Sequence, residues 1–383
     1  MRFRVGYLAV LAVAAVALAT RTTPAQDRTG DEIAQEMDAT QPPVIDPARR
    51  SDAQYMREQR KLAGDAMLRW RELAWELVTK WPEHERAPQA AKNRWRMMLR
   101  ENQSKATLTQ IAGEATALMT GTGELASEAR YAYAIAKGME SGWDPAGVSD
   151  AVEAFIEGAP DDERGAYLLD SMARVATAAE AKRELYERIV HMYAGASMAR
   201  FVPGKIRQMD EVGKPFELAF EDALTGEAFD IKDHLGKIVV VWFWAHESES
   251  SRSGMPQLVK MEAKYLPRNV QFVGVNLDKP ELVQERTTLL SYLGEKGVEW
   301  PQFFQSDGWN SGFSLAWGVD ALPMFFLIDH EGNLVNTDAG PELEANIEAL
   351  LTARDGPADV PATGDGPDPS LKPAEAPGER SGG

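Results

Sequence analysis

An uninterrupted apolar segment leads into a short polar loop in this chain, and the sequence contains no cysteine. Residues 239–256 read VVVWFWAHESESSRSGMP. A continuous apolar run of this kind is typical of a central strand that is buried on both faces. The residues beyond the run predict a loop and then a helix. Ser248 or Ser251 is expected to cap that helix, because a serine oxygen accepts hydrogen bonds from the free N–H groups of a helix start.

The spacing of several residues in this segment resembles the active-site segment of thioredoxin-like proteins of the TlpA/ResA and redoxin type. In that family the segment reads W-A-x-x-C-x-x-C-R-x-x-M-P. This chain lacks the two cysteines of the pattern. It keeps all the other fixed positions, which are Trp244, Ala245, Arg252, Met255 and Pro256. The resemblance implies that Ser248 and Ser251 occupy the positions of the redox cysteines.

The resemblance continues through much of the C-terminal part of the chain. It includes the segments GKPF at 213–216, GVNLD at 274–278, WGV at 317–319 and FLID at 326–329. It implies an α/β thioredoxin-like fold over residues 213–353, with a central mixed sheet flanked by helices. It also implies that Pro323 is cis and faces the loop, and that Leu322 offers backbone groups to an extended substrate. Met324 departs from the small hydroxyl residue that is usual in the family.

The missing cysteines remove the redox chemistry of this family. Thiol–disulfide exchange requires a thiolate that attacks a disulfide sulfur, and a helix N-terminus favours that thiolate by lowering the thiol pKa. A serine hydroxyl does not ionise near neutral pH and forms no mixed disulfide. Cysteine-based peroxidase chemistry also starts from a thiolate. The sequence therefore predicts a pseudoenzyme without catalytic residues for the reaction of its relatives.

Residues of the same loop suggest two other kinds of site. Ser248 as a hydrolytic nucleophile with His246 as its base would need an orienting group and oxyanion donors, and the sequence identifies neither. A metal site is also disfavoured, because none of the five histidines forms a pair four residues apart. We therefore expect helix capping at Ser248 or Ser251, no metal and no cofactor.

The ends and the charge of the chain limit where it acts and what it binds. Arg2 and Arg4 precede an apolar run over residues 5–19, and small residues at Thr23 and Ala25 suit cleavage. This pattern predicts a signal peptide over residues 1–25, with an uncleaved anchor as the alternative. After cleavage we expect an exported protein of the periplasm or cell envelope, without a stable membrane span. The net charge of −18 argues against nucleic acid as a partner.

Composition and periodicity divide the remaining chain. Residues 26–50 are polar and proline-containing, and we interpret them as a linker. Residues 51–211 have helical periodicity, and they resemble tetratricopeptide-type hairpins without keeping that repeat length, which predicts an all-α domain of irregular repeats or a bundle. Strand-like alternation begins near Phe216. Residues 355–383 are rich in Pro, Gly and Asp and predict a disordered tail.

These observations favour a binding protein. The predicted role is protein or peptide binding in the cell envelope, with an extended peptide along a groove beside Pro323, a second binding face on the helical domain, or both. The alternative is a thiol–disulfide oxidoreductase of redox homeostasis whose activity depends on a partner or on non-cysteine chemistry. The residues expected to bind are Trp244, Ser248, Ser251, Arg252, Leu322 and Pro323.

Overall fold

The computed structural model describes residues 28–279, 286–305 and 307–356, and it divides into two compact units at Ala178 and Ala179. The predicted signal peptide lies outside the described residues, as does the predicted tail beyond residue 356. Within the described ranges, no helix is both long and apolar enough to cross a membrane.

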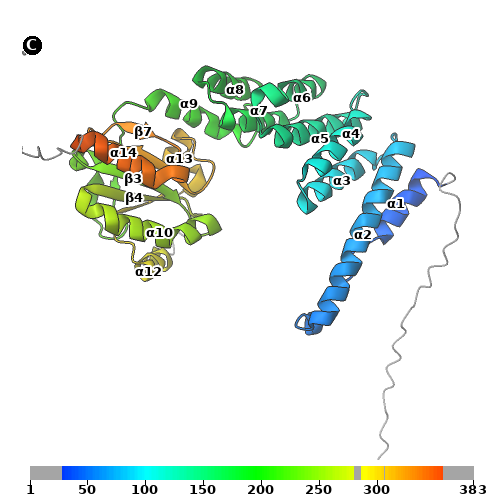
Figure 1. The fold of residues 1–383 in the computed structure, drawn as a ribbon, viewed down its shortest axis with the longest axis horizontal. Coiled ribbons are helices and arrows are strands. Elements are labelled where there is room, and N and C mark those ends of the chain that lie inside the picture. The colour runs from blue at the N-terminus through cyan, green and yellow to red at the C-terminus, as the bar shows by residue number, and fades with distance from the viewer. Residues whose placement is uncertain (1–27, 280–285, 306, 357–383) are drawn as a thin grey trace, which may run out of the picture. The chain divides into compact units, whose positions relative to one another are not determined.

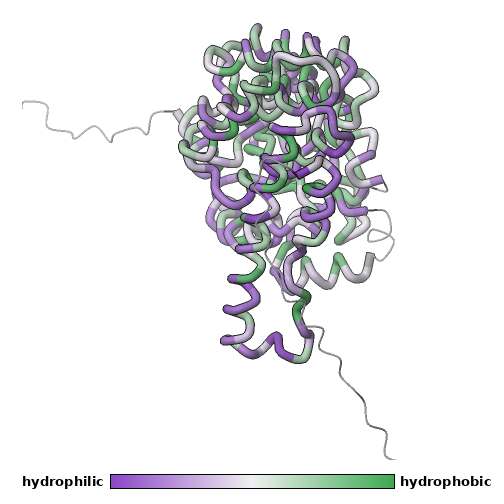
Figure 2. Tube along the Cα trace, turned by 90° about the vertical axis from the view of Figure 1, so that its right-hand side faces the viewer, coloured by the Kyte–Doolittle hydropathy of each residue, from purple (hydrophilic) through white to green (hydrophobic). Residues whose placement is uncertain are grey.

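The first unit is helical throughout its regular elements, and we call its described residues, 28–178, the helical unit (Figure 1). Its α-helices are α1 (Gly30–Ala39), α2 (Ala53–Lys80), α3 (Ala87–Glu101), α4 (Lys105–Thr116), α5 (Glu124–Ser141), α6 (Pro145–Gly158) and α7 (Arg164–Val175), with a 3-10 turn η1 (Pro47–Arg49). Hydrophilic and hydrophobic residues alternate along these helices, as expected of amphipathic helices that share a core (Figure 2).

Helix α1 corrects the prediction that residues 26–50 form a linker. Thr29 caps the helix and forms a reciprocal capping box with Glu32, which satisfies free N–H groups at the helix start. Ile33 and Met37 lie one turn apart and are almost fully buried in the same core as Leu73 of α2. The polar composition of the segment concealed this single apolar face, which is sufficient to pack one helix.

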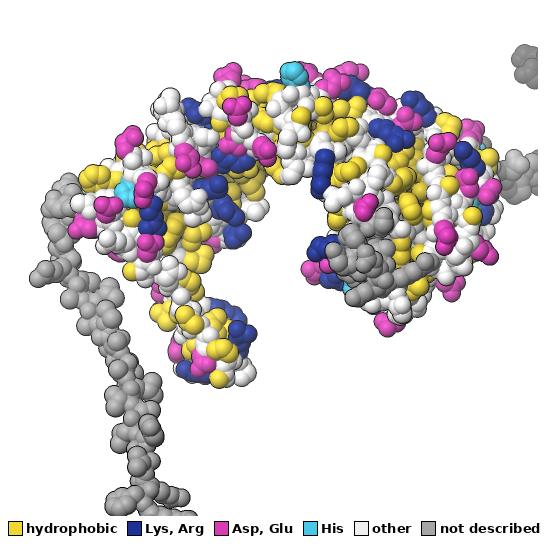
Figure 3. Space-filling model, turned by 180° about the vertical axis from the view of Figure 1, so that it is seen from behind, with side chains coloured by type: hydrophobic (Ala, Val, Ile, Leu, Met, Phe, Trp, Pro, Cys, Tyr) yellow, Lys and Arg dark blue, Asp and Glu magenta, His cyan; other side chains and the backbone are white. Residues whose placement is uncertain are grey.

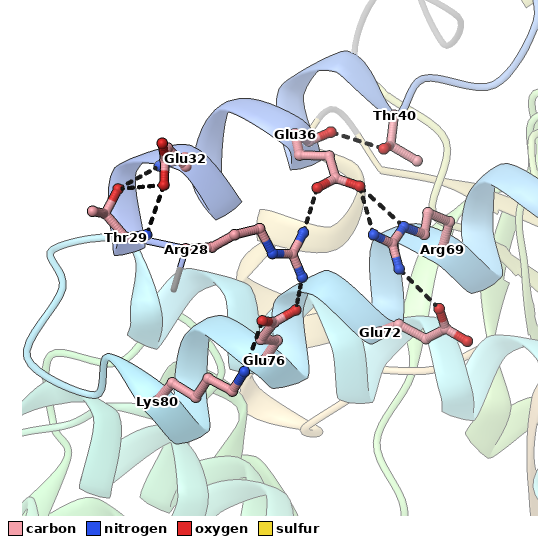
Figure 4. Close-up of polar contacts among 9 residues, drawn as sticks. All are labelled: Arg28, Thr29, Glu32, Glu36, Thr40, Arg69, Glu72, Glu76 and Lys80. Atoms are coloured by element: carbon pink, nitrogen blue, oxygen red, sulfur yellow. Dashed lines mark hydrogen bonds and ion pairs between the residues drawn. The ribbon is translucent and has the colours of Figure 1, made fainter. Parts of the chain in front are cut away.

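Ion pairs also join α1 to α2, as Figure 4 shows. Arg28 bridges Glu36 of α1 and Glu76 of α2. Arg69 of α2 returns to Glu36, with 2.6 Å between its Nη2 and the Glu36 carboxylate. Surface pairs contribute about 0–1 kcal/mol each, and these pairs are only partly buried, so the buried apolar face is the main reason that α1 packs.

The apolar stripe along α2 and its C-cap, formed by Met67, Trp70, Ala74, Leu77 and Trp81, is buried only in its middle. Leu73 and Leu77 are fully buried, whereas Met67 and Trp81 at the two ends of the stripe are 40% and 42% exposed. The core that they adjoin also contains Trp95 and Met98 of α3. Periodicity therefore identified the buried face of α2 but not the length over which α3 and α1 cover it.

The second unit begins earlier than the predicted boundary at residue 211. It contains α8 (Ala179–Met192), η2 (Ala199–Phe201), α9 (Val202–Glu211), β1 (Ala219–Glu221), β2 (Ala228–Asp230), η3 (Ile231–His234), β3 (Ile238–Trp244), α10 (Glu249–Tyr265), η4 (Leu266–Arg268), β4 (Val270–Asn276), α12 (Arg286–Lys296), β5 (Gln302–Phe304), η5 (Gly308–Asn310), α13 (Gly312–Ala316), β6 (Met324–Ile328), β7 (Leu334–Asn336), η6 (Gly340–Glu342) and α14 (Leu343–Asp355).

Contacts of α9 explain why this helix groups with the C-terminal unit. Gly204 lies so close to Gly318 that an added Cβ would overlap the Gly318 backbone. Lys205 forms a largely buried ion pair with Asp320, with 2.5 Å between Nζ and the carboxylate. The Gln208 side-chain amide donates to the carbonyl of Trp317. Helix α9 therefore supports the chain segment that leads to Leu322 and Pro323.

The C-terminal unit contains a five-stranded mixed sheet in the order β5-β4-β3-β6-β7. Strand β3 pairs parallel with β4 and antiparallel with β6. Side chains of β3 alternate between two cores: Trp242 and Trp244 face the core shared with α10, α12 and α14, and Val241 and Phe243 face the core shared with the β1–β2 hairpin and the region of α13. The predicted thioredoxin-like fold, with a mixed sheet flanked by helices, is confirmed.

Candidate functional site

Ser248 caps helix α10, one of the two capping positions predicted from the sequence. Its Oγ accepts a hydrogen bond from the Ser251 backbone N–H at 3.3 Å. The Ser248 and Ser250 hydroxyl oxygens are 2.9 Å apart, and the Ser250 hydroxyl donates to the carbonyl of Leu322 at 3.1 Å. Because the Ser250 proton goes to Leu322, Ser248 is the donor within the serine pair. The Ser248 hydroxyl therefore both accepts and donates inside the loop.

Ser251 and Arg252 stabilise the loop from the first turn of α10. Ser251 is fully buried, and its Oγ accepts from the Ala245 backbone N–H at 3.4 Å. The exposed Arg252 side chain donates to the carbonyl of His246. Both residues thus join the end of β3 to the start of α10, and this is the arrangement that positions a short loop over a helix N-terminus.

A buried carboxylate that the sequence analysis did not assign to the site holds the other side of the loop. Asp278 is 1% exposed and accepts the backbone N–H groups of His246 at 2.8 Å and Glu247 at 3.1 Å. The Asn276 side-chain amide donates to the same carboxylate at 2.6 Å. The motif GVNLD at 274–278 had been matched to the family, but the pairing of Asp278 with the loop backbone depends on the parallel register of β3 and β4.

Trp244 supports the loop from the core and is not part of an open groove. It is fully buried, stacks on Trp242 with 5.4 Å between ring centroids, and donates its indole N–H to Gln302 Oε1 at 3.0 Å. The Gln302 side chain occupies the space beside Gly274, where an added Cβ would overlap it. The prediction that Trp244 lines the peptide groove is therefore corrected, since its ring is buried in the core.

The bond between Leu322 and Pro323 is cis, as the resemblance implied. Pro323 is exposed and Leu322 is partly exposed, next to the Ser250 hydroxyl that occupies the Leu322 carbonyl. Met324, which follows, begins β6 and pairs with Phe243 of β3. The sheet therefore places the Leu322–Pro323 turn at the same end of β3 as the serine loop.

A mainly apolar hollow of about 180 Å³ opens beside Pro323. Its walls combine the first turns of α10 with β6 and the start of α14, and they include Ser250, Ser251, Gly254, Trp242, Phe325 and Leu343. Trp242 was not predicted as a site residue, and its indole nitrogen is buried without a hydrogen-bond partner among the described residues. Of the predicted binding residues, Ser251 and Pro323 line this hollow, whereas Ser248 and Leu322 lie at the loop beside it.

His246 does not form a catalytic pair with Ser248 among the described contacts. Its ring meets Tyr292 edge-on, with 4.7 Å between centroids. Burial raises the pKa of Tyr292, although the Arg252 charge opposes the shift, so that phenol stays protonated at neutral pH. The described part of the site contains neither a nucleophile with an adjacent base nor a thiol. It provides a hydrogen-bonded loop, an exposed cis-proline turn and an apolar hollow.

Comparison with known proteins identifies this part of the chain. Residues 211–351 match the family described as Redoxin. They form a thioredoxin-like domain that matches this family, and we call it the redoxin domain below. This domain is similar to the thiol-disulfide oxidoreductase ResA of Halalkalibacterium halodurans, which is 25% identical over 130 residues, covering 33% of this chain and 68% of that protein.

Other proteins match the redoxin domain over a similar range. The thiol:disulfide interchange protein HelX of Rhodobacter capsulatus is 30% identical over 129 residues, which cover 33% of this chain and 62% of that protein. Among solved structures, the thioredoxin domain of a thiol-disulfide oxidoreductase from Bacteroides vulgatus is 24% identical, with a TM-score of 0.31, and the match covers 37% of this chain and 97% of that domain.

Proposed function

We propose that this chain is an exported redoxin-domain protein that has no thiol–disulfide activity and binds an extended peptide segment of a partner protein in the cell envelope. The observation that carries the proposal is the pair Ser248 and Ser251 at the two redox positions of an otherwise intact loop. Both side chains form hydrogen bonds within the loop and its helix cap. The loop thus retains its geometry without a group that reacts with disulfides.

The absence of redox activity follows from chemistry. Relatives of the redoxin domain carry names such as thiol-disulfide oxidoreductase. That reaction forms and breaks a sulfur–sulfur bond, and each step needs a thiolate as attacking or leaving group. The chain has no cysteine at any position, so it has no sulfur that can enter the exchange.

The binding role rests on the surface that remains beside Pro323. An extended segment can pair its backbone with exposed main-chain groups and place alternate side chains in adjoining pockets. The Leu322–Pro323 turn is exposed, and the hollow beside it is lined by apolar atoms of Phe325, Leu343 and Trp242. These features suit a peptide that places one apolar side chain in the hollow.

Export is the third part of the proposal and rests on the sequence alone. The basic residues, the apolar run over 5–19 and the small residues before position 26 favour a cleaved signal peptide. Intact-mass measurement of protein purified from its own cells is expected to give the mass of a chain that begins at Gln26. A mass that includes residues 1–25 indicates an anchored protein.

Two experiments test redox inactivity and binding separately. In an insulin-reduction assay with dithiothreitol, the protein is expected to give the buffer rate; repurified material that accelerates the reaction contradicts inactivity. For binding, peptides selected from a random twelve-residue display library are titrated against the wild type, Gly254→Trp and Ser253→Trp. Gly254 lines the hollow and Ser253 does not, so only the first variant is expected to weaken binding, by about tenfold or ~1.4 kcal/mol.

The rival function, a partner-dependent oxidoreductase, makes a different prediction. Activity would appear when the protein is added to an envelope extract that contains thiol proteins, and it would disappear with the Gly254→Trp variant.

If neither Gly254→Trp nor Ser253→Trp affects binding of the selected peptides, the groove beside Pro323 is not their site.

A further inference from the structure

Two hollows in the helical unit lie on either side of one arginine of α3. Arg96 lines both hollows. We infer that they form one binding face for an extended peptide segment that carries acidic side chains and neighbouring apolar ones. This face, defined by Lys92, Arg96 and Arg100 with the walls of the two hollows, is called the α3 face below. It does not depend on the groove beside Pro323.

The first hollow has a volume of about 350 Å³ and lies between α3, α5 and α7. Apolar and aromatic side chains supply most of its wall, including Trp95, Leu99, Tyr131 and Ile135. Trp95 is 2% exposed, so its ring is a fixed part of the wall. This hollow has room for a large apolar side chain of a ligand.

The second hollow has a volume of about 440 Å³ and lies between α2, α3 and the residues that follow α1. Met67, Trp70 and Met97 line it, together with Pro42. Met67 is the 40% exposed residue at one end of the α2 stripe. Methionine side chains adapt to differently shaped apolar partners, which suits a site that receives a peptide.

Two of the three cations on the α3 face, Arg96 and Arg100, have no partner among the described residues. Among the described residues, no ion pair or hydrogen bond involves the side chains of Arg96 or Arg100, and both are exposed. Lys92 lines the first hollow and forms an ion pair with Glu128, with 3.6 Å between Nζ and the carboxylate. In Figure 3, Lys and Arg side chains on the visible face of the helical unit lie beside hydrophobic side chains.

The acidic groups near the α3 face each pair with a cation other than Arg96 and Arg100. Glu128 accepts a hydrogen bond from Arg164 at 2.8 Å, and Arg164 in turn lies over the ring of Tyr131 at 4.5 Å from its centroid. Glu101 forms an ion pair with Arg71, and Glu114 accepts from Arg94. The charges of Arg96 and Arg100 thus remain uncompensated in a chain whose net charge is −18.

The spacing of the three cations suits an extended anionic chain. Lys92, Arg96 and Arg100 are four residues apart in a helix, so each is about 6 Å further along the axis than the last. Side chains two residues apart on one face of an extended chain are separated by roughly 6.6 Å. Acidic residues at alternate positions therefore meet successive cations, and apolar residues before or after them reach the walls of the hollows.

Fluorescence anisotropy on the full chain tests the inference with a defined probe. The probe is a fluorescein-labelled ten-residue peptide with Glu at two alternate positions between flanking Leu and Phe residues, and the matched peptide has Gln in place of both Glu. We expect the acidic peptide to bind about tenfold more tightly than its Gln partner at low salt. This difference is expected to shrink towards 1 M salt, where the Debye length falls to about 3 Å.

Charge reversal locates the site. Arg96→Glu, and Arg100→Glu separately, are expected to weaken binding of the acidic probe by about tenfold while the far-ultraviolet spectrum is unchanged. Arg57→Glu makes the same charge change on an exposed residue of α2 that lines neither hollow, and it is expected to leave the affinity within about twofold.

Each remaining outcome overturns the inference. Equal affinity of the acidic and Gln peptides means that the α3 face does not distinguish a charged peptide from a neutral one. Equal weakening by Arg57→Glu and Arg96→Glu means that the attraction is a property of the whole surface. If sedimentation shows a dimer that Arg96→Glu dissociates, then a second copy of the chain is the occupant in place of a peptide.

Discussion

The redoxin domain and the helical unit differ in how their polar groups are used. In the loop of the redoxin domain, Ser248, Ser250 and Asp278 each bond to other groups of the same loop or to the turn beside it. On the α3 face of the helical unit, Arg96 and Arg100 form no ion pair or hydrogen bond among the described residues. The polar groups of the loop in the redoxin domain therefore satisfy one another, whereas two cations of the helical unit have no partner.

This difference separates two kinds of functional evidence. A family motif indicates the geometry of a loop. That geometry is kept when serine replaces cysteine, because a serine hydroxyl is a favoured cap of a helix start. An unpaired cation beside an apolar wall indicates a different thing: a ligand with an acidic group and an apolar side chain can still form favourable contacts there. The motif pointed to the loop around Ser248, whereas no motif pointed to Arg96.

The largest effect is expected when both cysteines are restored, and this double substitution tests whether the loop has the geometry of a redox site. Ser248→Cys with Ser251→Cys is expected to form a reversible disulfide, because the two positions already lie within one helix cap. The helix start favours the first thiolate, and Glu247 and Glu249 oppose it, so weak redox activity is expected. Thiol counting under oxidation and a glutathione titration measure it.

The single variant Ser248→Cys is the control for that experiment, since it has no second thiol to bridge. Two free thiols in a folded, oxidised double variant contradict the proposed geometry of the loop.

The next prediction tests whether α9 belongs with the redoxin domain. Gly204→Val places side-chain atoms against the backbone of Gly318 and Leu315. Backbone atoms cannot move aside as the end of a flexible side chain can. We expect the free energy of unfolding of the C-terminal unit to fall by about 3 kcal/mol. Urea denaturation measures it, with Gly294→Ala as the control because nothing lies within 4 Å of a Cβ at that position. Equal stability of the two variants contradicts the close packing of α9.

A smaller effect is expected from the buried carboxylate behind the loop. Asp278→Ala leaves the backbone N–H groups of His246 and Glu247 without their acceptor in a buried setting. The expected loss of unfolding free energy is about 2 kcal/mol. Asp307 is exposed and makes no cap hydrogen bond, so Asp307→Ala is the control. If both variants unfold at the same urea concentration, Asp278 does not hold the loop.

The smallest predicted effect concerns the acid sensitivity of the helical unit. Burial raises the pKa of Glu114, but hydrogen bonds from Arg94, Gln110 and Trp95 outweigh burial and hold that pKa below its usual value of 4.5. Because the folded-state pKa is lowered, this carboxylate stabilises the fold above about pH 4.5, and its contribution is lost as the pH falls below that value.

Glu114→Gln removes this contribution at neutral pH, where we expect a loss of about 1–2 kcal/mol and a flatter stability profile between pH 5 and 3. Urea midpoints across that range measure it, with Glu83→Gln as the control, because Glu83 is exposed and forms no hydrogen bond or ion pair among the described residues. A wild-type slope in the Glu114→Gln profile contradicts the assignment.

Much of the redoxin domain was predictable because its signals are local. The buried strands at Val270–Asn276 and Met324–Ile328 coincide with apolar runs of the sequence, which end where polar residues begin. Ser248 as the cap of α10 also follows from local rules, because capping involves one side chain and the next few N–H groups. The short strand Gln302–Phe304 carried no comparable pattern.

Other features depend on residues far apart in the sequence. The bonds from His246 and Glu247 to Asp278 require the parallel register of β3 and β4, and Trp244 is buried because Gln302 and Trp242 pack against it. Helix α9 lies with the redoxin domain because two glycines allow a close approach across more than a hundred residues of chain. Nothing in the neighbourhood of Gly204 encodes that contact.

The sequence by itself determined that the chain carries no thiol, because composition is independent of folding: without cysteine no conformation can supply a thiolate. It also determined the strand–loop–helix order around Ser248. Only the tertiary structure decided which charges remain unbonded. Arg94 and Arg96 are two residues apart, yet the first is paired with Glu114 in the helical core and the second is exposed between two hollows. A helix turns neighbouring side chains to different faces, and packing then decides which of them finds a partner.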